Sequence, residues 1–269
     1  MNHTRICRYL DEETARPRFG LVQEEEIKPL PLHFSYGTAD PHEAVHADAA
    51  ARPFGMEGAR LLAPVTPSKI VCVGRNYREH AAELGNPLPT EPLLFLKPPS
   101  AIIGPCETIE LPFVSERIEH EGELAVVIGR KVRRLADAED PLSYVYGYTC
   151  LNDVTARDLQ RRDVQFTRAK SFDTFCPVGP HVVKGLDPTN LSVRTRVNGE
   201  TRQDGRTSAM AFPCAALVRY ISHVMTLEPG DLIATGTPAG VGPLSDGDTV
   251  EVEVEGVGVL RNPVRRTPR

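Results

Sequence analysis

Short apolar segments separated by turn residues recur along most of the chain, and they limit the folds open to it. These segments are rich in β-branched and aromatic residues, and several alternate apolar with polar residues, which is the period of a strand. The strand-like segments cover residues 69–74, 93–97, 123–129, 144–151, 191–199, 231–236 and 249–260. Asn198 and Gly199 are typical of a hairpin turn at the end of one such segment.

Helical patterns are fewer than strand patterns. They cover residues 77–85, 158–165 and 212–225, and Gly85 is placed to end the first of them. The regular alternation of strands and helices that builds a parallel, doubly wound sheet is missing. We therefore predict an α+β fold dominated by β structure.

The N-terminal part of the chain differs in character from the rest. Residues 5–30 resemble a small hairpin followed by polar chain, and residues 37–58 are rich in Ala, His, Asp and Pro without a sustained period. Compact β-rich runs begin after residue 61. We predict a small N-terminal subdomain and connector over residues 1–65 and a main domain over residues 66–269.

Composition narrows the class of protein. A chain of 269 residues with 41% hydrophobic residues can bury a full-sized core. Its longest apolar runs are about six residues, whereas a bilayer span needs about 20, so we expect no membrane helix and no membrane partner. The charged first residues do not match a secretory signal, and the cytoplasm is the expected compartment.

Charge and cysteine usage exclude further classes. The net charge of -5 and the absence of Trp argue against a nucleic-acid partner, which would need a basic surface. The six cysteines include no CxxC pair and no zinc-finger spacing, so we interpret them as reduced, structural thiols.

Two glutamates and an aspartate form the first candidate site. Glu121 and Glu123 are two positions apart, so on a strand they would face the same side, and Asp153 follows about 30 residues later. Converging carboxylates repel one another, and a hard cation with oxygen ligands such as Mg²⁺ or Mn²⁺ removes that cost. The alternative interpretation is an acidic strand end in water.

A histidine and a glutamate form the second candidate site. His80 and Glu83 would share a face of a helix, where the carboxylate can hold the imidazole while its other nitrogen accepts a proton from water. The alternative is a surface helix on which this spacing is a coincidence. Arg75 and Asn76 directly follow the strand-like segment that ends at Gly74, and loops at strand ends carry function.

Two polar segments punctuated by Gly and Pro could bind an anionic ligand. Lys170, between small residues, can hold a carboxylate or stabilise an enolate, and the Gly-rich turn around Thr237 can offer N–H groups and a hydroxyl. This turn lacks the GxxxxGK[ST] pattern, so a nucleotide P-loop is rejected and a phosphate-binding protein rests on the turn alone.

Six motifs in a fixed order resemble the fumarylacetoacetate hydrolase family, over roughly residues 66–265. The motifs are CVGRNYREHAAE, FLKPPSAIIGP, EHEGELAVVIG, GYTCLNDVTARDLQ, AKSFDTFCPVGP and DLIATGTPAGVGP. The resemblance implies a mixed β-sandwich with a roll-like catalytic domain, a homodimer, and Mg²⁺ or Mn²⁺ in the site. It also favours the functional interpretations of the acidic and histidine sites over their alternatives.

The resemblance also implies a role for each candidate residue. It assigns metal binding to Glu121, Glu123 and Asp153, and catalysis to His80, Glu83 and Lys170. The segment with the histidine is typically a lid in this family. Contacts with substrate are implied for Arg75, Gln160 and Thr237.

The implied function is the metal-dependent hydrolysis of a carbon–carbon bond in a small 2,4-dioxo acid, with His80 and Glu83 activating water. The same site could serve an oxaloacetate decarboxylase or a 2-hydroxyhepta-2,4-diene-1,7-dioate isomerase. A metal-binding scaffold without turnover is the non-enzymatic alternative. The combination of dyad, carboxylates and Lys170 argues against it, since a scaffold does not need all three.

Overall fold

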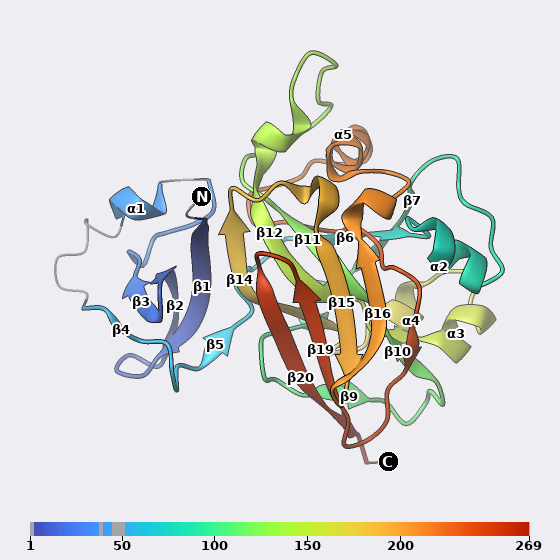
Figure 1. The fold of residues 1–269 in the computed structure, drawn as a ribbon. Helices are drawn as coiled ribbons and strands as arrows, with labels where there is room; N and C mark the ends of the chain where they lie inside the picture. Colours follow the sequence, from blue (N-terminus) through green and yellow to red (C-terminus); the bar gives the residue numbers. More distant parts are fainter. Residues whose placement is uncertain (1–2, 38–39, 45–51, 269) are drawn as a thin grey trace.

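The computed structural model describes residues 3–37, 40–44 and 52–268. It is a β-dominated α+β structure, as predicted, in which a twelve-stranded sheet and a five-stranded sheet face each other with short helices at one side (Figure 1). None of the helices within the described ranges is long and apolar enough to cross a bilayer.

The larger sheet has twelve strands and runs through the whole molecule. Its main path is, in spatial order, β4 (Phe54–Gly55), β3 (Glu26–Pro29), β2 (Arg16–Gln23), β1 (Thr4–Asp11), β14 (Cys176–Lys184), β12 (Val145–Asn152), β11 (Gly122–Ile128), β17 (Leu232–Ala234), β6 (Ile70–Gly74) and β7 (Leu93–Lys97). Two short strands lie off this path, β5 (Leu61–Leu62) beside β1 and β8 (Ile102–Ile103) beside β14. Because β1 pairs with β14, the N-terminal strands continue the main sheet.

Two smaller sheets complete the β structure. The five-stranded sheet contains β16 (Glu200–Arg206), β15 (Ser192–Val197), β19 (Thr249–Val254), β20 (Gly258–Arg266) and β9 (Ile109–Leu111). The three-stranded sheet contains β13 (Thr155–Ala156), β10 (Ile118–His120) and β18 (Gly242–Pro243).

The helices are short. The α-helices are α1 (Pro41–Ala44), α2 (Arg78–Glu83), α3 (Arg157–Arg162), α4 (Thr167–Lys170) and α5 (Cys214–Val224). Single 3-10 turns are η2 (Pro99–Ala101), η3 (Pro141–Tyr144), η4 (Pro188–Asn190) and η5 (Thr207–Ala209). Figure 1 shows α2, α3 and α4 together at the side of the molecule away from the N-terminal strands.

The apolar core lies on both faces of β11, which is buried along its whole length. Leu124 and Val126 pack toward the five-stranded sheet and α5, while Ala125 and Val127 pack on the opposite face with the N-terminal strands. A strand that is covered on both faces reads as an unbroken apolar run, which is why this segment does not alternate. Glu123 has the parity of Ala125 and Val127 and therefore faces away from the five-stranded sheet.

Most predicted elements are confirmed, with shorter bounds for the helices. The segment predicted as one strand over 249–260 is instead the hairpin of β19 and β20, which turns at Gly256 with a φ of 79°. The hairpin turn at Asn198 and Gly199 is confirmed, and both residues have positive φ. Part of the predicted connector, residues 38–39 and 45–51, lies outside the described residues. The division of the chain at residue 65 stays a prediction.

Strand β14 is the main element that the sequence pattern failed to predict. It lies between β1 and β12 inside the large sheet, although Pro177 and Pro180 lack the N–H that a ladder needs. The pairing with β12 is irregular between Tyr148 and Cys150, opposite the stretch that contains Pro180. An irregularity of this kind accommodates a proline in a central strand.

A buried histidine in β14 couples stability to pH. Burial, with a smaller effect of the Arg5 charge, lowers the pKa of His181 from 6.5 to about 4, and a contact with the Val257 backbone opposes this shift only in part. Between pH 6.5 and pH 4, the His181 side chain is protonated in the unfolded chain but neutral in the native state. Stability is therefore lost as the pH falls from 6.5 to 4.

We predict that His181→Leu removes about 2 kcal/mol of the stability loss between pH 7 and pH 5. The measurement is urea unfolding at both pH values, with the exposed His33→Leu as the control that should keep the loss. An unchanged pH dependence in His181→Leu would contradict the assignment.

Candidate active site and metal centre

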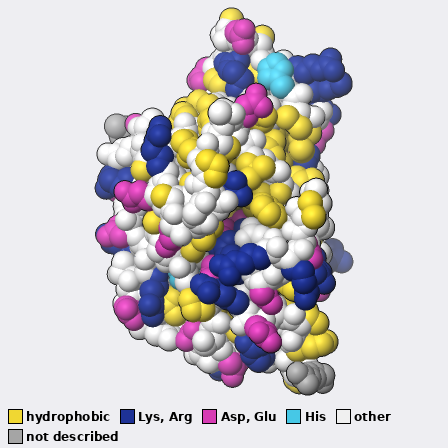
Figure 2. Space-filling view, turned by 90° about the vertical axis from the view of Figure 1, so that its right-hand side faces the viewer, with side chains coloured by type: hydrophobic (Ala, Val, Ile, Leu, Met, Phe, Trp, Pro, Cys, Tyr) yellow, Lys and Arg dark blue, Asp and Glu magenta, His cyan; other side chains and the backbone are white. Residues whose placement is uncertain are grey.

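One cavity of about 400 Å³ opens beside α2 and α3. All nine residues predicted for the site line it, although they come from segments far apart in the chain. They are Arg75, His80, Glu83, Glu121, Glu123, Asp153, Gln160, Lys170 and Thr237. Figure 2 shows the face of the molecule on this side, where Lys and Arg side chains gather near the centre. The roles of the nine residues stay predictions, but their convergence is a property of the fold.

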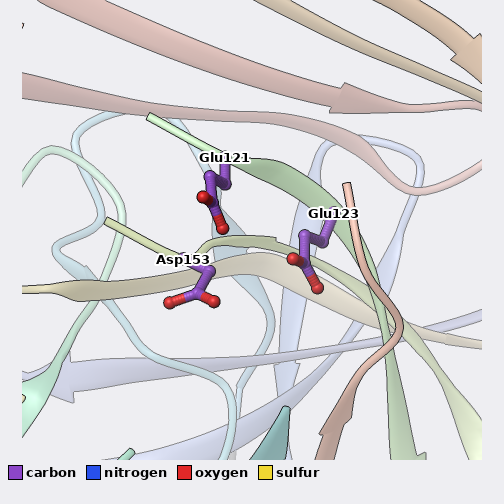
Figure 3. A group of neighbouring side chains, drawn as sticks. All are labelled: Glu121, Glu123 and Asp153. Carbon is purple, nitrogen blue, oxygen red and sulfur yellow. The ribbon is translucent and has the colours of Figure 1, made fainter. Parts of the chain in front are cut away.

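Strand pairing brings the three acidic residues together. Glu121 directly precedes β11 and Glu123 lies within it, while Asp153 directly follows β12. The antiparallel pairing of Gly122 with Asn152 places Asp153 beside Glu121, and the Asp153 N–H donates to the Glu121 carbonyl over 2.8 Å. One oxygen of each carboxylate lies within 4.8 Å of the others (Figure 3). All three residues are at most 5% exposed, so the interpretation as an acidic strand end in water is wrong.

The residue between the two glutamates has to be a glycine. A Cβ on Gly122 would lie 2.1 Å from Oγ1 of Thr195 and 3.3 Å from the side chain of Val252, both in the five-stranded sheet. The two sheets therefore touch directly behind the carboxylates. This close approach fixes the backbone from which Glu121 and Glu123 extend to the opposite side.

Two buried lysines partly neutralise the carboxylates. Lys170 Nζ donates to Glu121 Oε2 and to Asp153 Oδ2, each over 2.7 Å. Lys97 Nζ donates to Asp153 Oδ1 over 2.6 Å and to the Val154 carbonyl over 3.1 Å. Buried ammonium groups are costly unless paired in this way, so the lysines and the carboxylates depend on each other.

The two glutamates differ in their titration. Burial opposes ionisation of Glu121, but the charges of Lys170 and Arg157 hold the pKa of that carboxyl well below its usual range. Burial raises the pKa of Glu123 far above its usual range, and the charges of Asp153 and Glu121 raise it further. Among the described residues, Glu123 accepts a hydrogen bond from the Gly236 N–H, over 2.7 Å, and forms no ion pair.

The chemistry of these donors fits a divalent cation. The group offers carboxylate oxygens alone, which suit hard ions such as Mg²⁺ and Mn²⁺. A cation among them would also relieve the repulsion that raises the Glu123 pKa. The buried triad of Glu121, Glu123 and Asp153 can thus bind a metal ion, and its oxygen donors do not distinguish Mg²⁺ from Mn²⁺.

The predicted dyad forms on helix α2. His80 Nδ1 lies 3.3 Å from Glu83 Oε2, and His80 is 5% exposed. The Gly240 N–H also donates to the Glu83 carboxylate, over 3.1 and 3.2 Å. The pair is therefore held between α2 and the Gly-rich turn beside the cavity, and the buried His80 does not fit a plain surface helix. Its role as a base stays a prediction.

Gln160 and Thr237 are each oriented by a neighbour. Arg157, which is buried, donates to Gln160 Oε1 over 2.6 Å and also to Glu121 Oε1 over 2.5 Å. The Thr237 hydroxyl donates to the Gly122 carbonyl over 2.8 Å. Both side chains line the cavity, and neither is free to rotate without losing a bond.

Gln203 in β16 joins the backbone of the two glutamates to the Gly-rich turn. It is fully buried, and its Oε1 accepts from the Gly122 N–H over 3.0 Å and lies 3.1 Å from His120 Nδ1. Its Nε2 donates to Thr237 Oγ1 over 2.7 Å and to the Pro238 carbonyl over 2.8 Å. The oxygen and the NH₂ group of the Gln203 side chain are thus both engaged in holding these two segments together.

Sequence reasoning missed Lys97, Arg157 and Gln203. Lys97 is the charge that ends the apolar run LLFL, and Arg157 follows Asp153 by four residues, so both lie in the recognised motifs and could have been suspected. Gln203 lies in the polar strand ETRQDGR, where nothing in the pattern distinguishes it from exposed neighbours.

A cavity that combines a buried group of carboxylates with a histidine–glutamate pair offers ligands for a metal ion and a candidate general base, which are the parts of a metal-dependent enzyme site. The family model described as "Fumarylacetoacetate (FAA) hydrolase C-terminal" matches residues 69–265. The chain belongs to this family of enzymes, as its ordered motifs predicted.

Relatives within the family differ in the reactions that their names give. A crystal structure from Mycobacterium smegmatis, titled 5-carboxymethyl-2-hydroxymuconate delta-isomerase, is 43% identical with a TM-score of 0.87, covering 98% of this chain and 100% of that one. The oxaloacetate tautomerase YisK of Bacillus subtilis is 43% identical over 78% of this chain and 75% of its own length. The structure of maleylpyruvate hydrolase from Sphingobium sp. SYK-6, with manganese(II) and pyruvate, is 33% identical with a TM-score of 0.80 and coverage of 98% and 100%.

We predict that Gln203→Leu weakens Mn²⁺ binding about 10-fold or more, because the backbone between Glu121 and Glu123 loses its support. Isothermal titration calorimetry measures the affinity. The control is Asn262→Leu, which removes a buried amide that donates to the carbonyls of Gly104 and Glu107 away from the cavity. It should cost stability but leave Mn²⁺ affinity within about twofold. Equal affinities in both variants would contradict the role of Gln203.

Proposed function

We propose that this protein hydrolyses a carbon–carbon bond in a small 2,4-dioxo acid, with Mg²⁺ or Mn²⁺ held by Glu121, Glu123 and Asp153. The observation that supports this most is that the buried acidic triad and the His80–Glu83 pair line the same cavity. The family membership supports the enzyme class. A hydrolase needs both features within reach of one substrate.

The bound cation would supply Lewis acidity, which withdraws electron density from a 2-oxo acid. The residues of the chain supply the remaining contacts. Lys170 offers a positive charge to the acid, although two carboxylates share its ammonium group. Gln160, whose Oε1 accepts from Arg157, has its NH₂ group left to donate to a substrate oxygen.

The dyad would act as the base. Glu83 accepts at Nδ1 of His80, so that nitrogen carries the hydrogen and Nε2 is left with a lone pair that can take a proton from water. The Gly240 N–H fixes Glu83, so the ring keeps its orientation. The Glu83 carboxylate also stabilises the imidazolium that forms when His80 takes up the proton, which makes His80 a better base.

The reaction balances without a further reactant. Water loses a proton to His80 and adds to the distal carbonyl, and the bond between that carbonyl and carbon 3 breaks. Its electron pair stays on carbon 3, which takes up a proton. The products are a carboxylic acid and a 2-oxo acid.

The second candidate function is keto–enol tautomerisation or isomerisation of a 2-oxo acid. It is supported by the relatives named oxaloacetate tautomerase and 5-carboxymethyl-2-hydroxymuconate delta-isomerase, each 43% identical. In this reaction the same base moves a proton from carbon 3, and water does not take part.

A substrate panel tests the proposal. We expect Mn²⁺-dependent loss of acylpyruvate absorbance with release of pyruvate, and the second candidate predicts loss of the enol absorbance of oxaloacetate without release of pyruvate. Activity on neither class, at any concentration of Mg²⁺ or Mn²⁺, would refute the enzymatic proposal.

His80→Ala should lower kcat for hydrolysis by about 100-fold or more, since a positioned base contributes roughly that much. Mn²⁺ affinity should not change, because His80 is not among the proposed ligands. The control is His223→Ala, whose side chain contacts the Leu135 carbonyl outside the cavity and should leave kcat unchanged. Loss of Mn²⁺ binding in His80→Ala would show that its role is misassigned.

A further inference from the structure

We propose that Arg161, together with Arg75, binds a second carboxylate of the substrate, so that the enzyme prefers dicarboxylic 2-oxo acids over monocarboxylic ones. This inference rests on the proposed function of the cavity and adds the class of substrate. It follows from the charges that line the cavity and from the partners that each of them has.

Two of the cationic side chains at the cavity already have buried partners. Lys170 contacts Glu121 and Asp153, and Arg157 contacts Glu121 and Glu119. Neither of them has a charge left to neutralise a second substrate carboxylate. Both hold the acidic triad in place instead.

The other two guanidinium groups at the cavity are unpaired. Within the described ranges of the chain, neither Arg75 nor Arg161 makes an ion pair or a side-chain hydrogen bond, although both line the cavity. Glu83, the remaining cavity carboxylate, is taken by His80 and Gly240. The arginines therefore lack a counter-charge in the protein itself, and a ligand can supply one.

The backbone holds Arg75 in place at a cost. Its φ of 57° is left-handed, a conformation that non-glycine residues adopt rarely and that often marks functional sites. The next residue, Asn76, is fully buried and fixes this turn. Its Nδ2 donates to the carbonyls of Thr235 and Phe212, and its Oδ1 accepts from the Phe212 N–H. The turn that presents Arg75 to the cavity is thus built into the core.

Helix α3 adds two neighbouring donors. Gln160 and Arg161 are consecutive and both line the cavity. Because Arg157 donates to the side-chain Oε1 of Gln160, the NH₂ group of the same side chain is left for a ligand. Arg75, Gln160 and Arg161 together offer N–H donors alone, and planar guanidinium groups bind carboxylates with paired hydrogen bonds.

The arrangement suits a short acid with a charge at each end. The acidic triad, with the cation it would hold, takes the 2-oxo acid end, and Arg75 and Arg161 are the cavity residues that can take the charge at the other end. A volume of about 400 Å³ suits a small ligand of this kind. A monocarboxylic substrate would occupy the triad and leave both guanidinium groups without a partner.

The test compares two forms of one substrate that differ only in the distal end group. The probes are a 2-oxo dicarboxylic acid and the monomethyl ester of its distal carboxylate, assayed for the reaction that the wild-type enzyme catalyses. We expect Arg161→Met to lower the ratio of kcat/KM for the diacid over the ester by about 10- to 100-fold, mainly through KM.

Arg162→Met is the matched control. Arg162 is the next residue of the same helix and is exposed, as Arg161 is, but it does not line the cavity, so the same change in net charge should alter the ratio less than twofold. A variant with both Arg161→Met and Arg75→Met should lose more of the preference than either single variant.

The outcomes separate this inference from the proposed function. A wild-type enzyme that turns over the ester as well as the diacid, or an Arg161→Met variant that keeps the preference, would overturn the inference and leave the proposed function standing. Failure of the wild type on every 2-oxo acid would instead refute the proposed function.

Discussion

The repulsion among Glu121, Glu123 and Asp153 is the constraint on which the rest of the site depends. Three carboxylates buried within 4.8 Å of one another would destabilise the fold if nothing balanced them. Lys170 and Lys97 balance two of them, and Glu123 is left as the carboxyl whose pKa is raised. The carboxylates around Glu123 therefore outnumber the cationic side chains that neutralise them, and this excess of acidic groups is a property of a cation site.

This constraint reaches into the packing of the two sheets. The two glutamates share one face because they are two positions apart on extended backbone, and this backbone is held from behind, where Gly122 approaches Thr195 of the five-stranded sheet. Gln203, from the same sheet, bonds the Gly122 N–H and Thr237 at once. The five-stranded sheet thus supports the site without contributing a side chain to the cavity lining, and changes in its packing should reach the carboxylates.

Much of the fold and the site could be predicted from the sequence, because strand periodicity and ordered motifs are local signals. The pairing of β11 with β12 then brought residues 30 positions apart to one place. The prediction failed for residues whose role depends on contacts between distant parts of the chain. Strand β14 carries Pro177 and Pro180, which argue against a central strand until its irregular pairing is known. Gln203 is indistinguishable from polar surface until both sheets are in place.

The charged residues of the cavity fall into two groups. One group, the triad and the dyad, can serve both candidate reactions, and the other group can distinguish between substrates. Hydrolysis and tautomerisation both begin with a polarised 2-oxo acid and a base, so the same triad and dyad can serve either. The triad is built from buried strands, and few substitutions there leave its charges balanced. Arg75 and Arg161, which form no ion pair with any residue that the structure describes, lie at a strand end and on the short helix α3, so substituting them removes no charge that balances the triad. Substrate preference can therefore change at these positions while the chemistry of the buried carboxylates stays the same.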